Sequence, residues 1–273
     1  MPIPLEDSFK DIVGKAQRGQ KISESQLASR AGLEAGKLHS LLAGKFDEAA
    51  ARKVAPLLGL DPDALADAGK EAWYPRAPGE VDGLACFNTV FDDMTVNSYL
   101  VWDPAGKAAA AFDTGSDVSG MLEVVREKGL AVQLILLTHT HGDHVFDLDR
   151  LREKTGAPAY VSRRERIEGA QPFDEGKCFR LGALSIETRL TSGHSAGGIT
   201  YVVAGLARPI AVVGDALFAG SMGGGMFSYE DALKNNRENI LTLPGNTILC
   251  PGHGPLTTVA EEKMHNPFFR IAQ

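Results

Sequence analysis

The sequence is poor in cysteine, in long apolar runs and in excess positive charge. Its three cysteines (Cys86, Cys178 and Cys250) are widely spaced and odd in number, which excludes a disulfide framework and favours a reducing, cytoplasmic compartment. No stretch approaches the ~18 uninterrupted apolar residues of a membrane span, and the first residues lack the basic and apolar regions of a signal peptide. The net charge of −7 argues against general affinity for nucleic acid or anionic membranes, so we expect no membrane partner.

The chain divides into two regions that differ in their hydrophobic patterning. Over residues 1–72, apolar residues recur at helical spacing, and glycines stand where helices could end. Pro75, Pro78 and Gly79 then mark a linker, beyond which strand-like runs alternate with helical ones. We therefore expect a small all-α domain at residues 1–72, a linker at 73–83 and a layered α/β domain at 84–273.

Hydrophobic patterning assigns the individual elements. In the small region, a helix is expected at Glu48–Leu58, and Asp61-Pro62 could start another. In the larger region, helices are expected at Val118–Lys128, Val145–Lys154 and Tyr229–Leu241. Strands are expected at Leu84–Phe91, Thr95–Trp102, Ala108–Phe112, Val132–Leu137, Ile199–Ala204, Ile210–Val213 and Thr247–Leu249.

The segment from Gln26 to Leu38 resembles the helix-turn-helix of Cro-like phage repressors, in which a first helix ends at a glycine, here Gly32, and a recognition helix follows. Residues 1–72 nevertheless carry ten basic and eleven acidic residues, and Glu34 stands where phosphate would approach the second helix. Three interpretations therefore stay open for this region: DNA binding, an interaction module that makes the protein a homo-oligomer, or a domain that only packs on the larger one.

Four metal-competent side chains fall within seven residues of the larger region. Imidazole and carboxylate are ligands that suit zinc and its divalent neighbours. The cluster directly follows the apolar run Val132–Leu137, which places it at the carboxyl edge of a buried strand, where open α/β sheets carry their sites. The pattern predicts a metal site within the run Thr138-His139-Thr140-His141-Gly142-Asp143-His144.

A complete site needs further ligands from elsewhere in the chain. His194, Asp215 and His253 are the candidates, because each follows a strand-like run or stands beside glycines that open the backbone. Taken alone, each is equally compatible with a structural histidine or a turn aspartate. His39 and His265 are expected to be structural.

The ordered set resembles the metallo-β-lactamase superfamily over residues 84–268. This resemblance implies an α/β fold, an αβ/βα sandwich with the metals at one edge. It also implies that Asp215 bridges two metals and that Asp113, in Phe112-Asp113-Thr114-Gly115, contacts the ligands rather than the metals. One metal would be held by His139, His141 and His194, and the second by Asp143, His144 and His253.

Two segments narrow the resemblance to glyoxalase II-like (hydroxyacylglutathione hydrolase-like) thioesterases: Gly214–Ser221, and Pro251–Thr258 followed by Asn266-Pro267-Phe268. The best-known zinc β-lactamases carry cysteine at the place of Asp215, so antibiotic hydrolysis is not expected. One departure stands out. Residues 222–226 read Met-Gly-Gly-Gly-Met, where those thioesterases commonly have a Gly-Arg or similar polar segment, and this loss weakens the expectation of a glutathione-conjugate substrate.

The resemblance thus implies a metallo-hydrolase, most specifically a thioesterase, in which a hydroxide bridging two divalent ions attacks the substrate carbonyl and Asp143 orients it. Zinc is the expected ion, with iron or manganese as alternatives. A persulfide dioxygenase with a single iron uses the same ligand set and stays an open alternative. A ligand-sensing, DNA-binding regulator is a third hypothesis, whereas an acidic chain gives nuclease activity no support.

Overall fold

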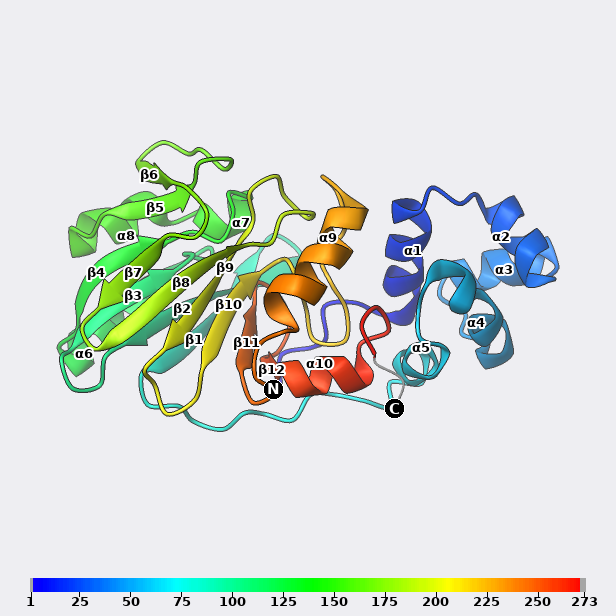
Figure 1. Cartoon of the computed structure of the whole chain (residues 1–273), viewed down its shortest axis with the longest axis horizontal. Helices are drawn as coiled ribbons and strands as arrows, with labels where there is room; N and C mark the ends of the chain where they lie inside the picture. Colours follow the sequence, from blue (N-terminus) through cyan, green and yellow to red (C-terminus); the bar gives the residue numbers. More distant parts are fainter. Residues whose placement is uncertain (1, 271–273) are drawn as a thin grey trace.

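Two six-stranded sheets face each other in the structure, a computed structural model that describes residues 2–270 (Figure 1). The first sheet follows the order of the sequence: β1 (Leu84–Phe91), β2 (Met94–Trp102), β3 (Ala108–Phe112), β4 (Ala131–Leu136), β5 (Ala159–Ser162) and β6 (Ala170–Phe173). The second has the order β12 (Thr257–Thr258), β11 (Ile248–Pro251), β10 (Ile210–Gly214), β9 (Ile199–Ala204), β8 (Leu184–Leu190) and β7 (Cys178–Leu181).

Helices cover the outer faces of both sheets. Helices α6 (Ser119–Lys128) and α8 (Leu148–Thr155) bury Met121 and Leu151 against the first sheet. Helices α9 (Tyr229–Asn235) and α10 (Val259–His265) lie against the second sheet (Figure 1). The inner faces meet in a core in which the rings of Phe112 and Tyr201 lie 5.4 Å apart, edge to face. Burial of this apolar area stabilises the sandwich, and the expected αβ/βα fold is confirmed.

Residues before the linker are helical and contain no strand between residues 2 and 83, as expected. The helices are α1 (Phe9–Gly19), α2 (Glu24–Ala31), α3 (Ala35–Leu42), α4 (Glu48–Val54) and α5 (Pro62–Gly69), with a 3₁₀ turn at Pro56–Leu58. Helix α2 begins at a capping Ser23, whose hydroxyl accepts from the Gln26 amide, and ends at Gly32 with φ of 61°. Helix α3 begins at Ala35, three residues after Gly32, which is the spacing that the helix-turn-helix pattern predicts. That α2 and α3 act as a DNA-binding helix-turn-helix stays a prediction.

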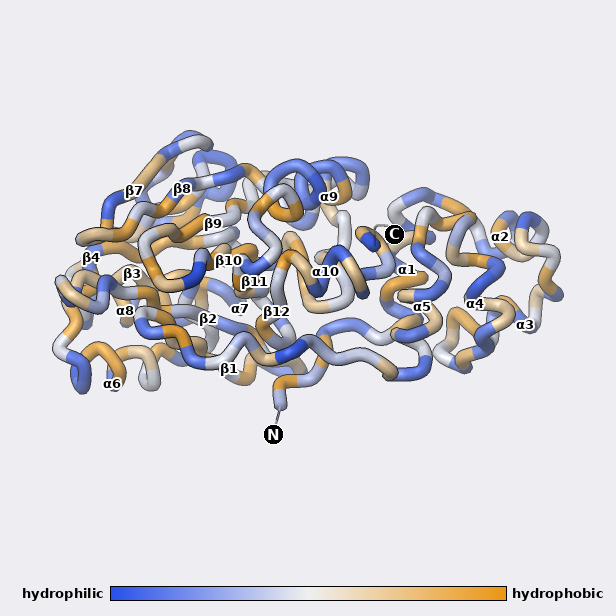
Figure 2. The backbone as a smooth tube through the Cα atoms, turned by 60° about the horizontal axis from the view of Figure 1, so that its bottom comes forward, coloured by the Kyte–Doolittle hydropathy of each residue, from blue (hydrophilic) through white to orange (hydrophobic). Residues whose placement is uncertain are grey.

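The helical region shares its core with the second sheet. Ile12 and Ala16 of α1 belong to one buried cluster with Val213 of β10 and Ala232 of α9. Figure 1 places α1 between the other N-terminal helices and α9, and Figures 1 and 2 show the linker running extended along one side of the molecule. Although the sequence suggested a separate region, the burial of α1 ties it to the segment that follows β10.

Three expected helices differ in detail. Glu48–Leu58 is α4, which ends at Val54, followed by the 3₁₀ turn at Pro56–Leu58. Val145–Lys154 is interrupted, because α7 (Gly142–Val145) ends before α8, and the Asp147 carboxylate between them accepts from the Val118 amide at 2.9 Å. Tyr229–Leu241 is α9 followed by a π-helical turn at Asn236–Ile240, where the Asn236 side chain donates to the Ala216 carbonyl at 2.8 Å. Within residues 2–270, no helix is long and apolar enough to cross a bilayer.

Candidate metal centre

The seven predicted ligands converge at one edge of the sandwich. They follow the carboxyl ends of β4, β8, β10 and β11, strands that belong to both sheets. Within each group, the potential ligand atoms all lie within 4.8 Å of one another. The first group consists of His139, His141, His194 and Asp215, and the second of Asp143, His144 and His253.

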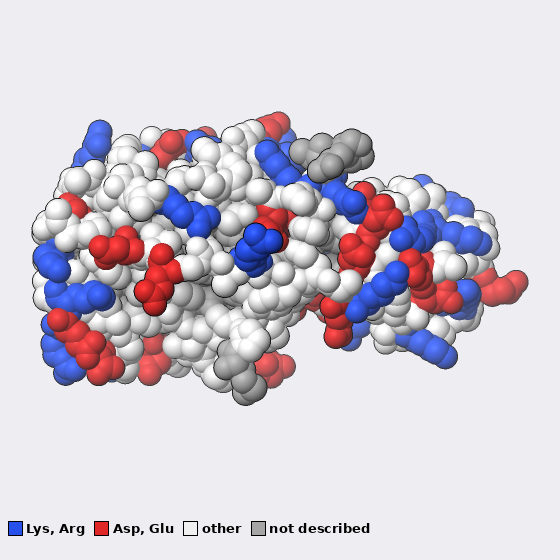
Figure 3. Space-filling view, turned by 90° about the horizontal axis from the view of Figure 1, so that it is seen from below, with Lys and Arg blue, Asp and Glu red and all other residues white. Residues whose placement is uncertain are grey.

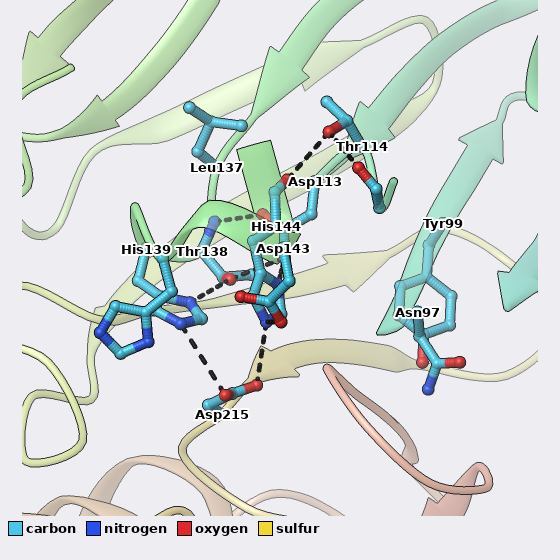
Figure 4. A network of polar contacts seen from close by, with 12 residues as sticks. Asn97, Tyr99, Asp113, Thr114, Leu137, Thr138, His139, Asp143, His144 and Asp215 are labelled. Carbon is cyan, nitrogen blue, oxygen red and sulfur yellow. Dashed lines mark hydrogen bonds and ion pairs between the residues drawn. The ribbon is translucent and has the colours of Figure 1, made fainter. Parts of the chain in front are cut away.

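Asp215 lies between the two groups. Its Oδ1 is 3.2 Å from Nε2 of His144, on one side. On the other side, its Oδ2 is 3.3 Å from Nε2 of His194. The same Oδ2 lies 3.8 Å from Nε2 of His139 (Figure 4). Nε2 of His253 is 3.4 Å from the same Oδ2. One carboxylate therefore faces both groups, which is the position that a bridging ligand requires.

The remaining ligand atoms also face one another. Asp143 Oδ2 lies 3.3 Å from Nε2 of His253 and 3.4 Å from Nε2 of His144. Nδ1 of His141 lies 3.0 Å from Nε2 of His194. In each group, the lone-pair positions of several rings and a carboxylate thus point to a common small volume, as metal coordination requires.

Asp113 supports one histidine of each group from behind (Figure 4). Its Oδ2 lies 2.9 Å from Nδ1 of His144 and accepts from the Thr138 hydroxyl at 2.7 Å, while its Oδ1 accepts from the Thr138 amide at 2.7 Å. The Thr138 hydroxyl oxygen is in turn 3.0 Å from Nδ1 of His139. Because a carboxylate only accepts hydrogen bonds, this relay of hydrogen bonds places the ring protons of His144 and His139 on Nδ1. The Nε2 atoms of both rings are then free to bind metal.

Backbone carbonyls orient two further histidines. Nδ1 of His253 lies 2.7 Å from the Thr95 carbonyl oxygen, and Nδ1 of His194 lies 3.2 Å from the Gly224 carbonyl oxygen. Since carbonyl oxygens are acceptors, both rings carry their proton on Nδ1, and Nε2 faces the centre. Thr138, Thr95 and Gly224 were not predicted from the sequence, because their roles depend on the positions of distant ligands.

Buried atoms without hydrogen-bond partners show that the site fits divalent metals. Nε2 of His139, Nε2 of His144 and Oδ1 of Asp215 are buried and make no hydrogen bond, although the last two lie 3.2 Å apart. A buried polar atom without a partner costs about 1–3 kcal/mol. Coordination would satisfy all three atoms, and the nitrogen and carboxylate donors suit zinc, iron or manganese.

The electrostatics of the centre also favour cations. Burial lowers the pKa of His144, but the carboxylates of Asp215 and Asp113 outweigh it and raise this pKa to about 10. Burial likewise opposes the charge on His253, but Asp215 and Asp143 raise the pKa of His253 to about 11. The carboxylates therefore stabilise positive charge here, and metal binding would displace protons from these rings.

Gly252 permits the close approach of the two halves of the centre. A Cβ on Gly252 would lie 2.1 Å from Oδ1 of Asp215 and 2.6 Å from Cε1 of His144. Neither neighbour can move away without leaving the centre, so only glycine fits beside His253.

Glu262 and Asn266 hold the loop that follows Asp215. The Gly220 amide and the Asn266 side chain donate to Glu262 Oε2 at 3.0 and 2.7 Å, and Thr257 donates to Oε1 at 2.7 Å. Asn266 also donates to the Ser221 carbonyl at 2.8 Å. Burial raises the pKa of Glu262 to about 7, although the hydrogen bonds from Thr257 and Asn266 oppose it.

The two remaining histidines lie in other surroundings. His39 of α3 is 74% exposed, with Nδ1 3.5 Å from Glu24. The His265 ring stacks on Trp73 with centroids 5.0 Å apart. Neither belongs to the two ligand groups.

Comparison with known proteins places the chain in a family. The family model for the metallo-beta-lactamase superfamily matches residues 91–253, and the chain belongs to this superfamily. A probable metallo-hydrolase of Bacillus subtilis, YqgX, is 35% identical over 184 residues, which cover 58% of this chain and 85% of that protein.

Two further relatives carry different activities in their names. The hydroxyacylglutathione hydrolase GloC of Haemophilus influenzae is 29% identical over 63% of this chain and 92% of its own length. The mitochondrial persulfide dioxygenase ETHE1 of Bos taurus is 29% identical over 62% of this chain and 70% of its own. The family membership and the hydrolase-named relatives support an enzyme of the metallo-hydrolase type.

Proposed function

We propose that the protein hydrolyses a thioester at a centre of two divalent ions, expected to be zinc. Asp215 carries this proposal, because its carboxylate faces both histidine groups at 3.2–3.4 Å. His139, His141 and His194 would bind one ion, and Asp143, His144 and His253 the other. When bound, such a pair of ions lowers the pKa of water towards neutrality and polarises the scissile carbonyl.

Residues around the ligands fix the orientation and the protonation of the ligand side chains. Asp113 and Thr95 fix the ring protons of His144 and His253 on the far side from the centre. Burial raises the pKa of Asp143, but the hydrogen bond with His253 and the nearby His144 more than offset it, so this pKa is lowered. Asp143 therefore stays ionised and orients rather than takes protons.

A thioester suits this arrangement because its leaving group, a thiolate, needs no proton donor. A thiol has a pKa of ~8.5, so the thiolate departs without a proton donor, whereas an amine does not. The hydrolase names of YqgX and GloC support the same class of reaction.

The test is thiol release from acyl thioesters by the zinc-loaded full chain. We expect the His139→Ala/His141→Ala double variant to lose at least ~10³-fold in kcat/KM, since removal of ligands abolishes the polarising charge. His39→Ala is the matched control, because His39 is exposed and outside the centre. Full activity in the double variant contradicts the proposal.

Persulfide dioxygenation is the second candidate, favoured by the ETHE1 relative. It requires iron and molecular oxygen instead of a hydrolytic metal pair. Oxygen uptake with glutathione persulfide by the iron-loaded protein, without thiol release from any thioester, would establish this alternative.

A DNA-binding regulator receives less support. Lys37 of the proposed recognition helix pairs with Asp47 at 3.0 Å, which neutralises its charge. Figure 3 shows basic and acidic side chains intermixed over the helical region on that face. We expect no mobility shift of mixed duplex DNA at low salt, and a salt-sensitive shift would revive this hypothesis.

A further inference from the structure

A cavity of about 520 Å³ connects the metal centre to the helical region. Three proposed metal ligands, His194, Asp215 and His253, line one side of it. A larger cavity of about 760 Å³ lies elsewhere along the helical region and has no proposed ligand in its wall. The N-terminal residues Glu6, Lys15, Arg18 and Gly19 contribute a further wall of the 520 Å³ cavity.

Close packing fixes α1 in this wall. A Cβ on Gly19 would lie 2.2 Å from the Tyr229 ring, so the end of α1 contacts α9 directly. The Lys15 ammonium donates to the Met222 carbonyl at 2.9 Å, in the glycine-rich segment after Asp215. These N-terminal residues lie outside residues 91–253, which match the family model.

The two cations of the wall differ in their partners. Lys15 pairs with Asp7 at 2.5 Å and lies 5.0 Å from the Phe218 ring centroid, so its charge is already compensated. Arg18 is exposed, and within residues 2–270 no carboxylate lies within 4.0 Å of its guanidinium. Arg18 is therefore the cation of this wall that is available to a ligand.

One end of this wall lies beside the metal centre. Glu6 passes beside Gly254, next to His253, since a Cβ on Gly254 would lie 3.3 Å from the Glu6 amide nitrogen. Arg18 lies in the last turn of α1, and its guanidinium reaches back along the helix to Gly14, since a Cβ on Gly14 would lie 2.8 Å from Arg18 Nη1. The lining of the same cavity includes the apolar side chains Met94, Phe218 and Met226.

We propose that α1 forms part of the substrate site and that Arg18 binds an anionic group of the substrate. This inference rests on the proposed thioesterase function, which places the scissile carbonyl at the metal centre. The substrate is then a thioester that carries an apolar part and a carboxylate or phosphate group. Arg18 supplies from α1 the basic residue that the segment 222–226 lacks.

Matched substrates test this assignment in the zinc-loaded full chain. One pair of acetyl thioesters has a thiol part that ends in a carboxylate or in the corresponding carboxamide. A second pair carries the same difference at the end of the acyl part. The variants are Arg18→Ala and Arg18→Glu, with Arg30→Ala on the exposed face of α2 as the control.

We expect Arg18→Ala to lower the ratio of kcat/KM for carboxylate over carboxamide about five- to tenfold in one pair, because a charge-assisted contact is lost. Arg18→Glu should reverse the preference, and Arg30→Ala should keep the native ratio. The pair that responds shows whether the anion belongs to the thiol or to the acyl part. Equal ratios in the native protein and both Arg18 variants overturn the inference.

A binding measurement separates this inference from the proposed function. The probes are stable thioether analogues of the same carboxylate and carboxamide compounds, titrated calorimetrically into native and Arg18→Ala protein with and without zinc. If no thioester is hydrolysed but the carboxylate thioether binds Arg18→Ala about five- to tenfold more weakly, the hydrolase proposal fails and the anion site stands. If both thioethers bind both proteins equally, the anion site is refuted whatever the activity.

Discussion

Asp113→Asn perturbs both halves of the centre through one atom. Oδ2 of Asp113 serves His144 directly at 2.9 Å and His139 through the Thr138 hydroxyl, whose oxygen lies 2.7 Å from Oδ2 and 3.0 Å from the His139 ring. An amide group at this place would donate where the carboxylate accepts. The His144 Nδ1–H would then face another donor, and the Thr138 hydroxyl would turn its proton towards His139.

The expected loss of metal affinity follows from the two orientations that the new side-chain amide of the Asp113→Asn variant can adopt. With its nitrogen at the Oδ2 position, the protons of His144 and His139 move to Nε2, and both rings lose the lone pair that binds metal. With its nitrogen at the Oδ1 position, it faces the Thr138 amide, which now donates to Asp113 at 2.7 Å. A buried donor without an acceptor costs about 1–3 kcal/mol, so metal binding in the second orientation is weakened by roughly 10- to 100-fold.

Zinc competition with a coloured chelator measures this loss in the full chain. Asp117→Asn is the matched control, since Asp117 is 55% exposed and does not contact the centre. Thermal unfolding of the metal-free proteins checks that both variants fold. Native zinc affinity in Asp113→Asn would refute the reasoning that Asp113 fixes the ring protons.

Two further predictions concern packing and pH. Gly252→Ala should reduce activity at least ~100-fold, because its Cβ would lie 2.1 Å from Asp215 Oδ1 and 2.6 Å from His144 Cε1. The control variant Gly245→Ala should retain the activity, because its Cβ would make only an ordinary contact at 3.6 Å. Equal activity of these two variants in the thioester assay would contradict the close approach. Glu262 should make the native protein less stable as pH rises, because its folded pKa of about 7 exceeds the unfolded value of 4.5, so the stabilisation is complete below pH 4.5 and lost through pH 7. Chemical unfolding of the native protein and Glu262→Gln should therefore give free energies whose difference changes by about 3 kcal/mol across this window, and a constant difference would show that Glu262 ionises normally.

The sequence predicted much of the sheet framework because the strands that carry the ligands are apolar and well separated. β1, β3 and β9 have the expected bounds, and β4 and β10 differ by one residue at their ends. The strands β5 to β8 and the short β12 were missed. The first four have only four to seven residues, and Arg180, Glu187 and Gln171 interrupt their apolar pattern.

The candidate ligands were predictable for a different reason. The spacing of His139, His141, Asp143 and His144 is local, and a resemblance supplied their partners at 194, 215 and 253. Spacing alone could not indicate that Thr138 links Asp113 to His139, since this contact depends on the pairing of β3 with β4.

The wall formed by α1 could not be predicted at all. Lys15 and Arg18 stand more than 200 residues before His253 and belong to a region whose sequence suggested a separate domain. The burial of Ile12 and Ala16 against the second sheet, together with the contact of Gly19 with Tyr229, brings their helix to the cavity. Long-range packing of this kind leaves no local pattern in the sequence.

Metal stoichiometry tests the central claim most directly. The full chain, purified without chelators, is analysed for zinc, iron and manganese per protein, and the metal-free protein is titrated with zinc. We predict two divalent ions per chain, with the second lost in Asp215→Asn, because Asp215 faces both groups at 3.2–3.4 Å. A single ion per chain under zinc saturation, with Asp215→Asn binding as the native protein does, would contradict a two-metal centre bridged by Asp215.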